Sequence, residues 1–448
     1  ITNYSESSPP TNVAFINNGD ETFAQLTHSA IVSEPSISFD ASWVDYDNDG
    51  LVDLYVTNFQ GSNYLYRQDD TGFVQVTDPP IGSDAAASLA TAWSDYDSDG
   101  DMDLFVANAW GDRHDYLYVN NGDGQFAKCT TQVTIASYDS WGGSWSDYDN
   151  DGDQDLFVTS LVSGDLPNSY DYLYVNNGDG TFTMDPGQAP CLVGARTEGS
   201  AWGDYNNDGF LDLFVAVAGP NLLYRNQGDG TFIRVTEGAI VTDDFVSRAG
   251  AWSDYDRDGD LDLYVANGDY LVNSFYENNG NSNNWLVIEC VGVESNRMAI
   301  GARVTAKATI SGNSTYQMRE ISSRSGGNCQ NSSNVHFGLG DAVIIDSIKV
   351  EWPSGATQIL TDVVVNQYLN IEEECCNRMT GNVDYDPGDI VDIGDLTALI
   401  DFLFISYTEP VCMEEANVDG VSPVDIGDVT DLISYLFIPP YPEPASCE

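Results

Sequence analysis

The sequence predicts a mainly β protein in which a β-propeller is followed by a small β-sandwich or β-barrel domain and a short α-helical tail. A tryptophan-centred motif recurs about every 50 residues in the first part of the chain. Alternating apolar and polar residues then follow from residue 285 to residue 353. Near the end, two acidic segments each run into apolar residues at helical spacing. We therefore expect three domains, at residues 1–282, 283–374 and 375–448.

The tryptophan-centred motif opens each repeat, and its first copy reads WVDYDNDGLVDLYVTN. Each unit predicts four short strands: a small-residue strand that ends at the tryptophan, an alternating strand such as DLFV, an LYVNN strand and a TF strand after a glycine turn. Four antiparallel strands repeated every ~50 residues describe a propeller blade. A helical solenoid is the alternative, but no unit has apolar residues at helical spacing. The copies start at Trp43, Trp93, Trp145, Trp202 and Trp252.

The two ends of the repeat region are incomplete in complementary ways. Residues 1–30 contain FINNGDETF, which matches the last two strands of a blade, whereas the Trp252 unit lacks its final strand. Because an unpaired edge strand promotes association, we expect the strand around residues 21–27 to complete the Trp252 blade. Closure within one chain gives five blades, or six if the N-terminal piece stands as a partial blade. Donation of the same strand to a neighbouring molecule would instead build a polymer.

Each repeat also carries oxygen side chains at alternate positions around a glycine, in the pattern Asp-x-Asp/Asn-x-Asp-Gly-x-x-Asp. Clustered carboxylates repel one another unless a cation lies among them, and the glycine permits the bend that brings them together. Hard oxygen ligands favour Ca²⁺, because Mg²⁺ demands stricter octahedral geometry and softer metals prefer His or Cys. The predicted side-chain ligands are Asp45, Asp47, Asp49, Asp53; Asp95, Asp97, Asp99, Asp103; Asp147, Asp149, Asp151, Asp155; Asp204, Asn206, Asp208, Asp212; and Asp254, Asp256, Asp258, Asp262. The predicted backbone-carbonyl ligands are Leu51, Asp101, Asp153, Phe210 and Asp260.

The alternative for these loops is a plain polar turn with solvated carboxylates, since Asp, Asn and Gly are common in turns. Five copies with the same carboxylate positions favour the metal interpretation. Five ions held between blade strands would mainly hold the loops in their folded conformation and so stabilise the fold. The sequence therefore predicts five structural calcium sites in the propeller.

Composition limits the possible partners. The 448 residues include 71 Asp and Glu against 15 Lys and Arg, a formal charge of -56, which argues against nucleic acid because a phosphate binder needs clustered cations. Hydrophobic residues make up 42%, enough for sizeable cores. No apolar run approaches the ~20 residues that span a bilayer. The chain starts without Met or a basic-then-apolar leader, so we expect an exported protein whose signal peptide has been removed.

The cysteines fall in even numbers within each predicted domain, and no pair has the C-x-x-C spacing of a metal site. Even numbers are what internal disulfides require, so an oxidising compartment is expected. Buried free thiols are the alternative. The eight are Cys129 and Cys191, then Cys290 and Cys329, then Cys375, Cys376, Cys412 and Cys447.

The repeats resemble the FG-GAP/VCBS family, whose calcium-bearing blades are also seen in integrin α-subunit propellers. The resemblance covers residues 12–280 and rests on the five matched loops. It implies a propeller, an extracellular setting and a binding or scaffold role. Such propellers commonly have seven blades, whereas five loops are visible here, and Asn206 replaces a carboxylate in the fourth loop.

The middle region has alternating strands beginning near Trp285, Ala302, Thr315 and Asp346, which describe a small β-sandwich or barrel. Its segments GARV, REI, HFGLG and WPSG resemble the ASPIC/UnbV domain over residues 285–373. This resemblance implies no catalytic residue. We interpret His336 in HFGLG as a packed histidine rather than a general base, because no Ser or Cys nucleophile motif accompanies it.

The tail contains two units, from Asn382 and Asn417, in which VDIGD precedes the apolar residues Leu396, Leu399, Ile400, Leu403 and Val429, Leu432, Ile433, Leu436. They resemble a type I dockerin, a duplicated calcium-loop-and-helix module that docks a cohesin. The first loop carries an insertion at residues 387–388 and the second has Val421 where a carboxylate belongs, so one or two weaker calcium sites are expected. A disulfide-pinned helical hairpin without metal is the alternative. The ligands that the resemblance implies are Asp384, Asp386, Asp392, Asp395, Asn417, Asp419, Asp425 and Asp428.

Together these features predict a secreted or cell-surface, non-enzymatic binding or structural protein of bacterial type. Its partner would be another protein or identical subunits, joined head to tail into a filament through strand complementation or the tail. A carbohydrate-binding adhesin or lectin that uses Trp110, Trp141 and Tyr138, aromatics outside the repeated positions, is the alternative. A polysaccharide-degrading enzyme anchored by the dockerin-like tail is a third possibility, although nearly all candidate carboxylates belong to the ion loops.

Overall fold

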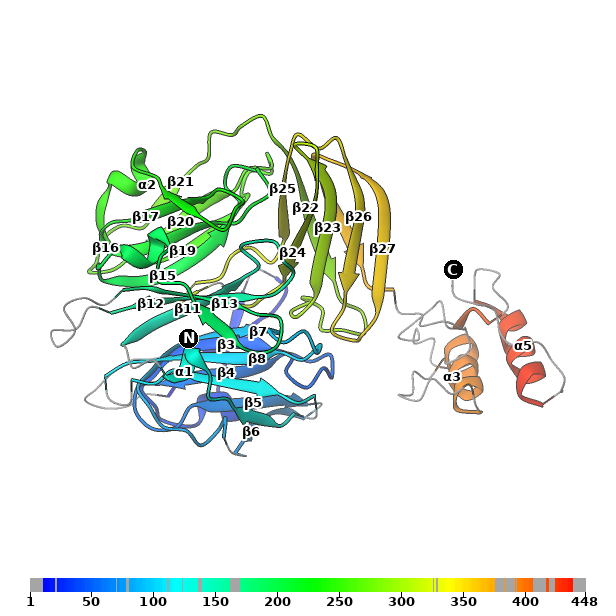
Figure 1. Cartoon of the computed structure of the whole chain (residues 1–448). Coiled ribbons are helices and arrows are strands. Elements are labelled where there is room, and N and C mark those ends of the chain that lie inside the picture. Colours follow the sequence, from blue (N-terminus) through cyan, green and yellow to red (C-terminus); the bar gives the residue numbers. More distant parts are fainter. Residues whose placement is uncertain are drawn as a thin grey trace. The chain divides into compact units, whose positions relative to one another are not determined.

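The computed structural model describes residues 11–20, 22–69, 71–77, 80–110, 113–122, 124–135, 139–161, 170–324, 326–327, 329–374, 383, 391, 393–405, 416–418 and 424–437. The chain divides into two compact units. The first comprises Ile1–Cys290 and Ser295–Ile371, and the second comprises Val291–Glu294 and Glu372–Glu448. The region expected as a propeller and most of the region expected as a separate β domain thus pack into one unit (Figure 1).

Each tryptophan-centred repeat forms one antiparallel sheet, as its alternating pattern predicts. The first four sheets have four strands each, and the fifth has three. A pairing between the ends of β16 and β19 joins the fourth and fifth sheets. The strands are β3 (Ser38–Val44), β4 (Asp53–Asn58), β5 (Tyr64–Asp69), β6 (Gly72–Val76); β7 (Ser88–Ser94), β8 (Asp103–Asn108), β9 (Tyr116–Asn120), β10 (Phe126–Lys128); β11 (Ser140–Ser146), β12 (Asp155–Ser160), β13 (Tyr172–Asn176), β14 (Phe182–Met184); β15 (Thr197–Gly203), β16 (Asp212–Pro220), β17 (Leu222–Asn226), β18 (Phe232–Arg234); and β19 (Asp244–Ser253), β20 (Asp262–Asn267), β21 (Ser274–Tyr276).

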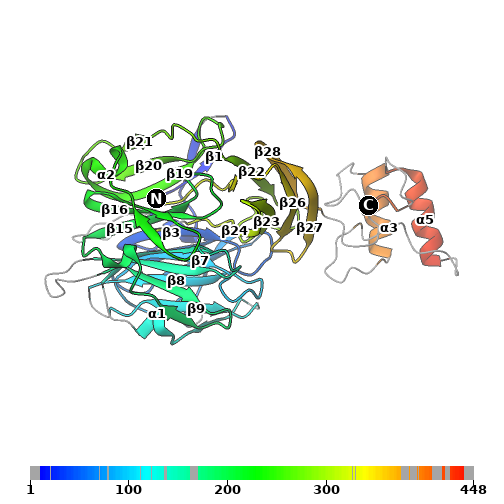
Figure 2. The ribbon, with the colours of Figure 1, turned by 45° about the horizontal axis from the view of Figure 1, so that its top comes forward.

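The blades stack face to face, and this explains why the second strand of a blade is apolar throughout. In β8, Leu104 and Val106 enter the core shared with the preceding blade, whereas Phe105 and Ala107 enter the core shared with the following blade. The first strands of successive blades lie next to one another in the order β3, β7, β11, β15, β19. Figure 2 shows these sheets from a second direction. The arrangement is that of a β-propeller with five sheets in the described part of the chain.

The N-terminal hairpin does not complete the fifth blade, so that expectation was wrong. Strands β1 (Ala14–Asn17) and β2 (Phe23–Leu26) pair only with each other in the described residues. Ala14 and Leu26 pack on the core of the first blade. The hairpin satisfies its own inner hydrogen bonds and buries its small apolar face there, which corresponds to the partial-blade alternative.

Four short helical segments connect or flank the blades. They are η1 (Ala30–Val32), α1 (Gln132–Ile135), η2 (Ala189–Leu192) and α2 (Ala239–Thr242).

The region after the propeller forms a β-sandwich, called here the β-domain. One sheet has the order β25-β22-β28 and the other the order β24-β23-β26-β27. Leu286, Val304, Phe337 and Ile348 from both sheets meet in one fully buried core. The strands are β22 (Asn284–Val291), β23 (Arg303–Ile310), β24 (Asn313–Glu320), β25 (Val335–Gly340), β26 (Ile344–Glu351), β27 (Thr357–Val364) and β28 (Gln367–Glu372).

The disulfides expected in the propeller and the β-domain are absent, because Cys129, Cys191, Cys290 and Cys329 are free thiols. Cys129 and Cys191 belong to the cores of different blades, and Cys290 belongs to the core of the β-domain. The physical reason is that an even number of cysteines in a domain does not by itself bring two sulfur atoms together. The other four cysteines lie outside the described residues.

The tail contains helices α3 (Ile393–Phe404) and α5 (Ile426–Phe437), where the apolar spacing predicted helices. Leu399, Val429 and Leu432 are buried between them. Each helix carries a buried aspartate, Asp395 or Asp428, in its first turn. In the described part of the chain no helix is long and apolar enough to cross a membrane.

Candidate metal centres

All five aspartate loops connect the first strand of a blade to the second, and they therefore emerge at the same end of the sheets. The last aspartate of each loop is the first residue of the second strand, as Asp53 is in β4. Two backbone positions make the bend. Asn48 in the first loop has φ 53° and Gly50 has φ 83°, and the other loops repeat both left-handed positions. The spacing in the sequence is thus converted into a tight turn that faces its carboxylates inward.

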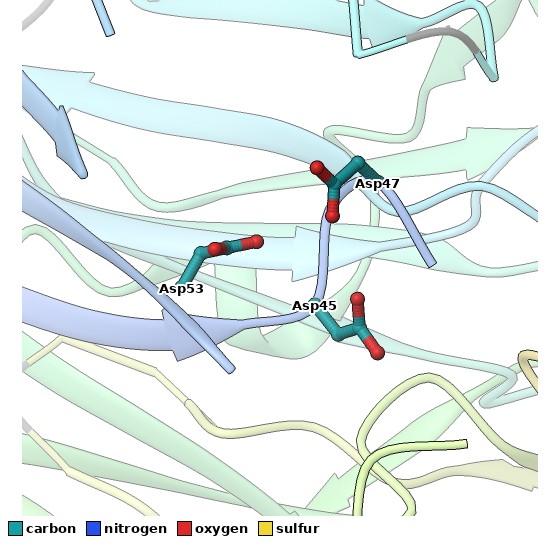
Figure 3. A group of neighbouring side chains, drawn as sticks. All are labelled: Asp45, Asp47 and Asp53. Atoms are coloured by element: carbon teal, nitrogen blue, oxygen red, sulfur yellow. The ribbon is translucent and has the colours of Figure 1, made fainter. Parts of the chain in front are cut away.

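The structure brings together three of the four predicted side-chain ligands in each of four loops, and the fourth members, Asp49, Asp103, Asp155 and Asp258, are not in these groups. In four loops, three carboxylates offer oxygens that all lie within 4.8 Å of one another. Figure 3 shows the first of these groups, whose members come from both sides of the β3–β4 turn. The groups are Asp45, Asp47, Asp53; Asp95, Asp97, Asp99; Asp147, Asp149, Asp151; and Asp254, Asp256, Asp262.

The fourth loop is also gathered, although an amide replaces one carboxylate. Asn206 donates from Nδ2 to Asp212 Oδ2 over 3.3 Å. The backbone N–H of Asp208 donates to Asp204 Oδ1 over 3.1 Å. These contacts hold the same four positions together as in the other loops.

The last aspartate of each loop is fixed by main-chain donors of the third strand. In the third loop, Asp155 Oδ1 accepts the N–H of Asn176 over 2.8 Å. Its second oxygen, Oδ2, is buried and has no hydrogen-bond partner, and the whole residue is 0% exposed. A buried carboxylate oxygen without a partner is strongly unfavourable. A cation in the loop would satisfy it.

Burial and mutual repulsion act on these carboxylates in the same direction. Burial raises the pKa of Asp53 from 3.8 to about 8 and that of Asp103 to about 9. Burial, together with the nearby charge of Asp49, raises the pKa of Asp45 to about 7. Each loop therefore resists ionisation until a positive charge compensates it.

The donors fit calcium. They are hard oxygens in a flexible loop, with several carboxylates per site and no His or Cys among them. The backbone carbonyls of Leu51, Asp101, Asp153, Phe210 and Asp260 stay predicted ligands. A positive side chain, missed in the sequence, also reaches the first loop: Arg67 Nε lies 2.7 Å from Asp47 Oδ2. The sequence signal that could have identified it is the arginine directly after the Leu-Tyr pair of the third strand.

The tail ligands are only partly described. Asp395 and Asp428 are fully buried, Asp425 is exposed, and Asp428 Oδ2 accepts the N–H of Asp425 over 2.6 Å. Asn417 has a buried Oδ1 without a hydrogen-bond partner. The remaining candidates, Asp384, Asp386, Asp392 and Asp419, lie outside the described residues.

The remaining residues that the sequence singled out are a histidine of the β-domain and aromatic residues outside the repeated positions. His336 is 9% exposed, and its Nε2 donates to the Gly259 carbonyl over 3.0 Å, which confirms the packed-histidine interpretation. Burial lowers its pKa to about 4, so the ring is neutral at neutral pH. Trp110 is 43% exposed and packs edge-on against the buried Trp141. Tyr138 lies outside the described residues.

Sequence reasoning missed the segment between β24 and β25, which reaches the first strand of every blade. Ser323 Oγ donates to Trp43 O and Ser322 Oγ to Trp93 O. Asn331 Nδ2 donates to Trp202 O over 3.0 Å. The other contacts are Gly327 against Gly142, Cys329 Sγ to Ser200 O, and Ser332 N to Trp252 O. A segment that touches all five inner strands lies at the centre of the propeller.

The fold and the loops define a β-propeller of aspartate-loop repeats joined to a β-sandwich. Family models agree with this description. Residues 45–106, 95–158, 159–215 and 204–265 match the FG-GAP-like repeat, and residues 292–377 match the ASPIC and UnbV domain. The chain therefore contains four matched FG-GAP-like repeats and one ASPIC and UnbV domain. Among curated proteins, none matches it.

Several solved structures are partly similar to the chain. An Agrocybe aegerita lectin, described as recognising non-reducing terminal N-acetylglucosamine, has TM-score 0.40 and 18% identity, covering 60% of this chain and 74% of the lectin. A Lactobacillus plantarum protein has TM-score 0.40 and 13% identity, covering 62% and 80%. The fucose-specific lectin of Aleuria aurantia has TM-score 0.34 and 11% identity, covering 69% and 87%.

Proposed function

We propose that this chain is a calcium-stabilised, non-enzymatic binding or structural protein that works outside the cell. The observation that carries the proposal is the recurrence of one carboxylate arrangement in four of the five blades, with the buried Asp155 Oδ2 lacking a partner in one of them. Ions at these loops would cancel repulsion that otherwise opposes folding. Their main effect would be on stability, because cations that bind only the folded state stabilise it by mass action.

An extracellular setting follows from the same chemistry. Loops of this kind, partly exposed and rich in charge, suit the ~10⁻⁴–10⁻³ M affinity range of extracellular calcium modules. The surplus of 71 acidic over 15 basic residues further favours solution rich in divalent cations. Export from the cell is part of this proposal.

The proposal is tested by counting ions. Protein freed of metal with a chelator is titrated with CaCl2, and native mass spectrometry reports the number bound. We expect at least four ions per chain, and a melting temperature that rises markedly with calcium. A chain that takes up none, and melts at the same temperature in chelator and in calcium, would rule the proposal out.

Self-association is the favoured mode of action, and a specific observation supports it. The fifth blade has three strands, and β21 pairs only with β20 in the described residues. The separate β1–β2 hairpin exposes Phe15 at 49%, Ile16 at 53% and Phe23 at 65%. An open sheet edge and an apolar half-blade on one chain are complementary to those of a second copy. Repetition of that contact would give a head-to-tail filament.

The tail offers a second surface for a protein partner. Ile393 and Phe404 on α3, and Ile426 and Phe437 on α5, are each more than half exposed. Exposed apolar side chains on two packed helices are typical of a docking face. We propose that this dockerin-like tail binds a protein, with calcium at its loops.

Glycan binding is the second candidate function. Trp110 presents an exposed indole and has φ 49°, a left-handed conformation that is unusual for a bulky residue. It packs on Phe59 and Trp141. Exposed indoles held rigidly are suited to stack on sugar rings.

A further inference from the structure

The fifth ion loop is held by side chains of the β-domain. Tyr368 on β28 donates from its hydroxyl to Asp254 Oδ2 over 2.6 Å. The guanidinium of Arg257 lies 4.1 Å from the centre of the Tyr368 ring, and the Trp285 ring meets the same ring edge-on at 5.8 Å. Arg257 and Trp285 thus flank the phenol that donates to the first aspartate of the loop.

The glycine of the same loop is enclosed by the β-domain as well. His336 donates to the Gly259 carbonyl over 3.0 Å. A Cβ added at Gly259 would lie 1.8 Å from the Trp285 ring, so the loop and the indole are in close contact. Tyr368, Trp285 and His336 come from three strands of one sheet of the β-domain. The sheet therefore fits the loop at several points.

The other loops are contacted by the same domain. Each contact involves the loop itself or the residue next to its last aspartate. Two of them reach the first aspartate directly. The contacts are Asn296 Nδ2 to Asp45 Oδ2 at 3.4 Å, Arg303 Nη1 to Asp95 Oδ2 at 3.5 Å, Gln154 Nε2 to Met318 Sδ at 3.7 Å, and Gly340 N to Asn207 O at 2.8 Å.

A carboxylate has two oxygens, and an ion needs only one of them in a fixed direction. At Asp254, Oδ2 accepts from the hydroxyl of Tyr368 and from the backbone N–H of Gly259, and Oδ1 accepts the N–H of Asp258. Tyr368 therefore adds a donor from the β-domain to the donors of the loop itself. Hydrogen bonds to ligand carboxylates orient them and typically contribute 10- to 100-fold in metal affinity. A neutral hydroxyl gives this orientation without adding a positive charge that would oppose the cation.

We propose that the β-domain supplies the outer shell of the ion loops, with Tyr368 as the positioning residue of the fifth loop for a divalent cation. This inference rests on the proposed calcium binding. Because coupling between two sites is reciprocal, a cation in the fifth loop also holds the β-domain against the propeller. The ion loops then join two parts of the chain as well as stapling the blades.

The test uses the full chain and its Tyr368→Phe variant, with Tyr270→Phe as control because Tyr270 is fully exposed. Calcium titrations by calorimetry and native mass spectrometry give the affinity and number of ions. We expect Tyr368→Phe to weaken one site by roughly 10-fold or more and to leave the others unchanged. Calcium should raise the melting temperature of the variant less than that of the parent protein, whereas a merely structural role would lower the melting temperature equally in calcium and in chelator.

Hydrogen exchange supplies a second readout. Calcium should slow amide exchange in residues 254–262 and 366–371 of the parent protein, and much less so in Tyr368→Phe. If the parent protein binds calcium and the variant keeps every site at equal affinity, the outer-shell inference is wrong while calcium binding stands. If the parent protein binds no calcium, both fall.

Discussion

Asn176 donates a hydrogen bond from Nδ2 to the backbone carbonyl of Tyr96 over 2.8 Å, which joins the third strand of one blade to the aspartate loop of the blade before it. Asn120, Asn226 and Asn278 make the corresponding bond to Tyr46, Tyr148 and Tyr205. The first asparagine of the LYVNN pattern is thus a blade-to-blade connector.

Replacement of this connector should destabilise the propeller. Asn176→Ala leaves the buried Tyr96 carbonyl without that donor, and we expect a loss of about 1–3 kcal/mol in the free energy of unfolding. The side chain of the neighbouring Asn177 is exposed and bonds only locally, to Thr181 and Thr183, so Asn177→Ala is the matched control with an effect of about 0.5 kcal/mol or less. Urea unfolding of both variants in calcium measures the difference. Equal effects would show that the interblade bond is not important.

The effect of Asp155→Asn on the melting temperature should have opposite signs in calcium and in chelator. In calcium, the variant loses a charged ligand, and we expect a lower melting temperature than that of the parent protein. In chelator, the substitution replaces a buried carboxyl, whose pKa is raised well above 3.8 by burial, with an amide that cannot ionise, so the variant should melt at the same temperature or higher. Asp179→Asn, in an exposed turn, is the control. A variant that melts lower in both solutions would contradict the ion site.

The ion-free protein should lose stability as the pH rises. Burial raises the folded-state pKa of Asp53 to about 8 and of Asp103 to about 9, against 3.8 for an ordinary aspartate. Between these values the folded chain holds protons that the unfolded chain has released. The contribution of these protonated carboxyls to the free energy of unfolding is therefore complete below about pH 4. It is lost as the pH rises through their folded-state pKa values. Thermal melts in chelator from pH 5 to 9 measure this slope, and calcium should abolish it.

The segment at the propeller centre should tolerate no added methyl group at Gly326. A Cβ there would lie 2.0 Å from the Ser200 carbonyl oxygen, and the residue has φ 146°. Gly355→Ala is the control, because Gly355 also has positive φ, 88°, but open space around it. We expect Gly326→Ala to destabilise the protein by about 2 kcal/mol more than the control does. Similar melting of the two variants would place the segment elsewhere.

Self-association should depend on the N-terminal hairpin. Phe15→Ser with Phe23→Ser removes exposed apolar groups that have no place in the first-blade core. We expect native mass measurements to show assemblies for the parent protein and single chains for the double variant. Val343→Ser, at a residue 80% exposed on the β-domain, controls for the loss of an apolar surface group. A parent protein that stays monomeric in calcium would end the filament proposal.

The sequence by itself determined the blades and the aspartate loops. The tryptophan repeat, the apolar second strand and the alternate aspartates are local patterns, and local hydrogen bonding and turn geometry are enough to produce a strand-turn-strand unit from them. The helices of the tail were predictable for the same reason, since helical spacing places Leu396, Leu399 and Leu403 on one face of α3.

Only the tertiary structure decided how these units are completed. The N-terminal hairpin lies on the first blade because Ala14 and Leu26 find an apolar surface there, and its sequence fits a blade edge equally well. Tyr368 and Asp254 are 114 residues apart, and the segment around Gly326 crosses all five blades. Such contacts depend on the packing of whole sheets, whose shape is the sum of many weak interactions and leaves no periodic signal in the sequence.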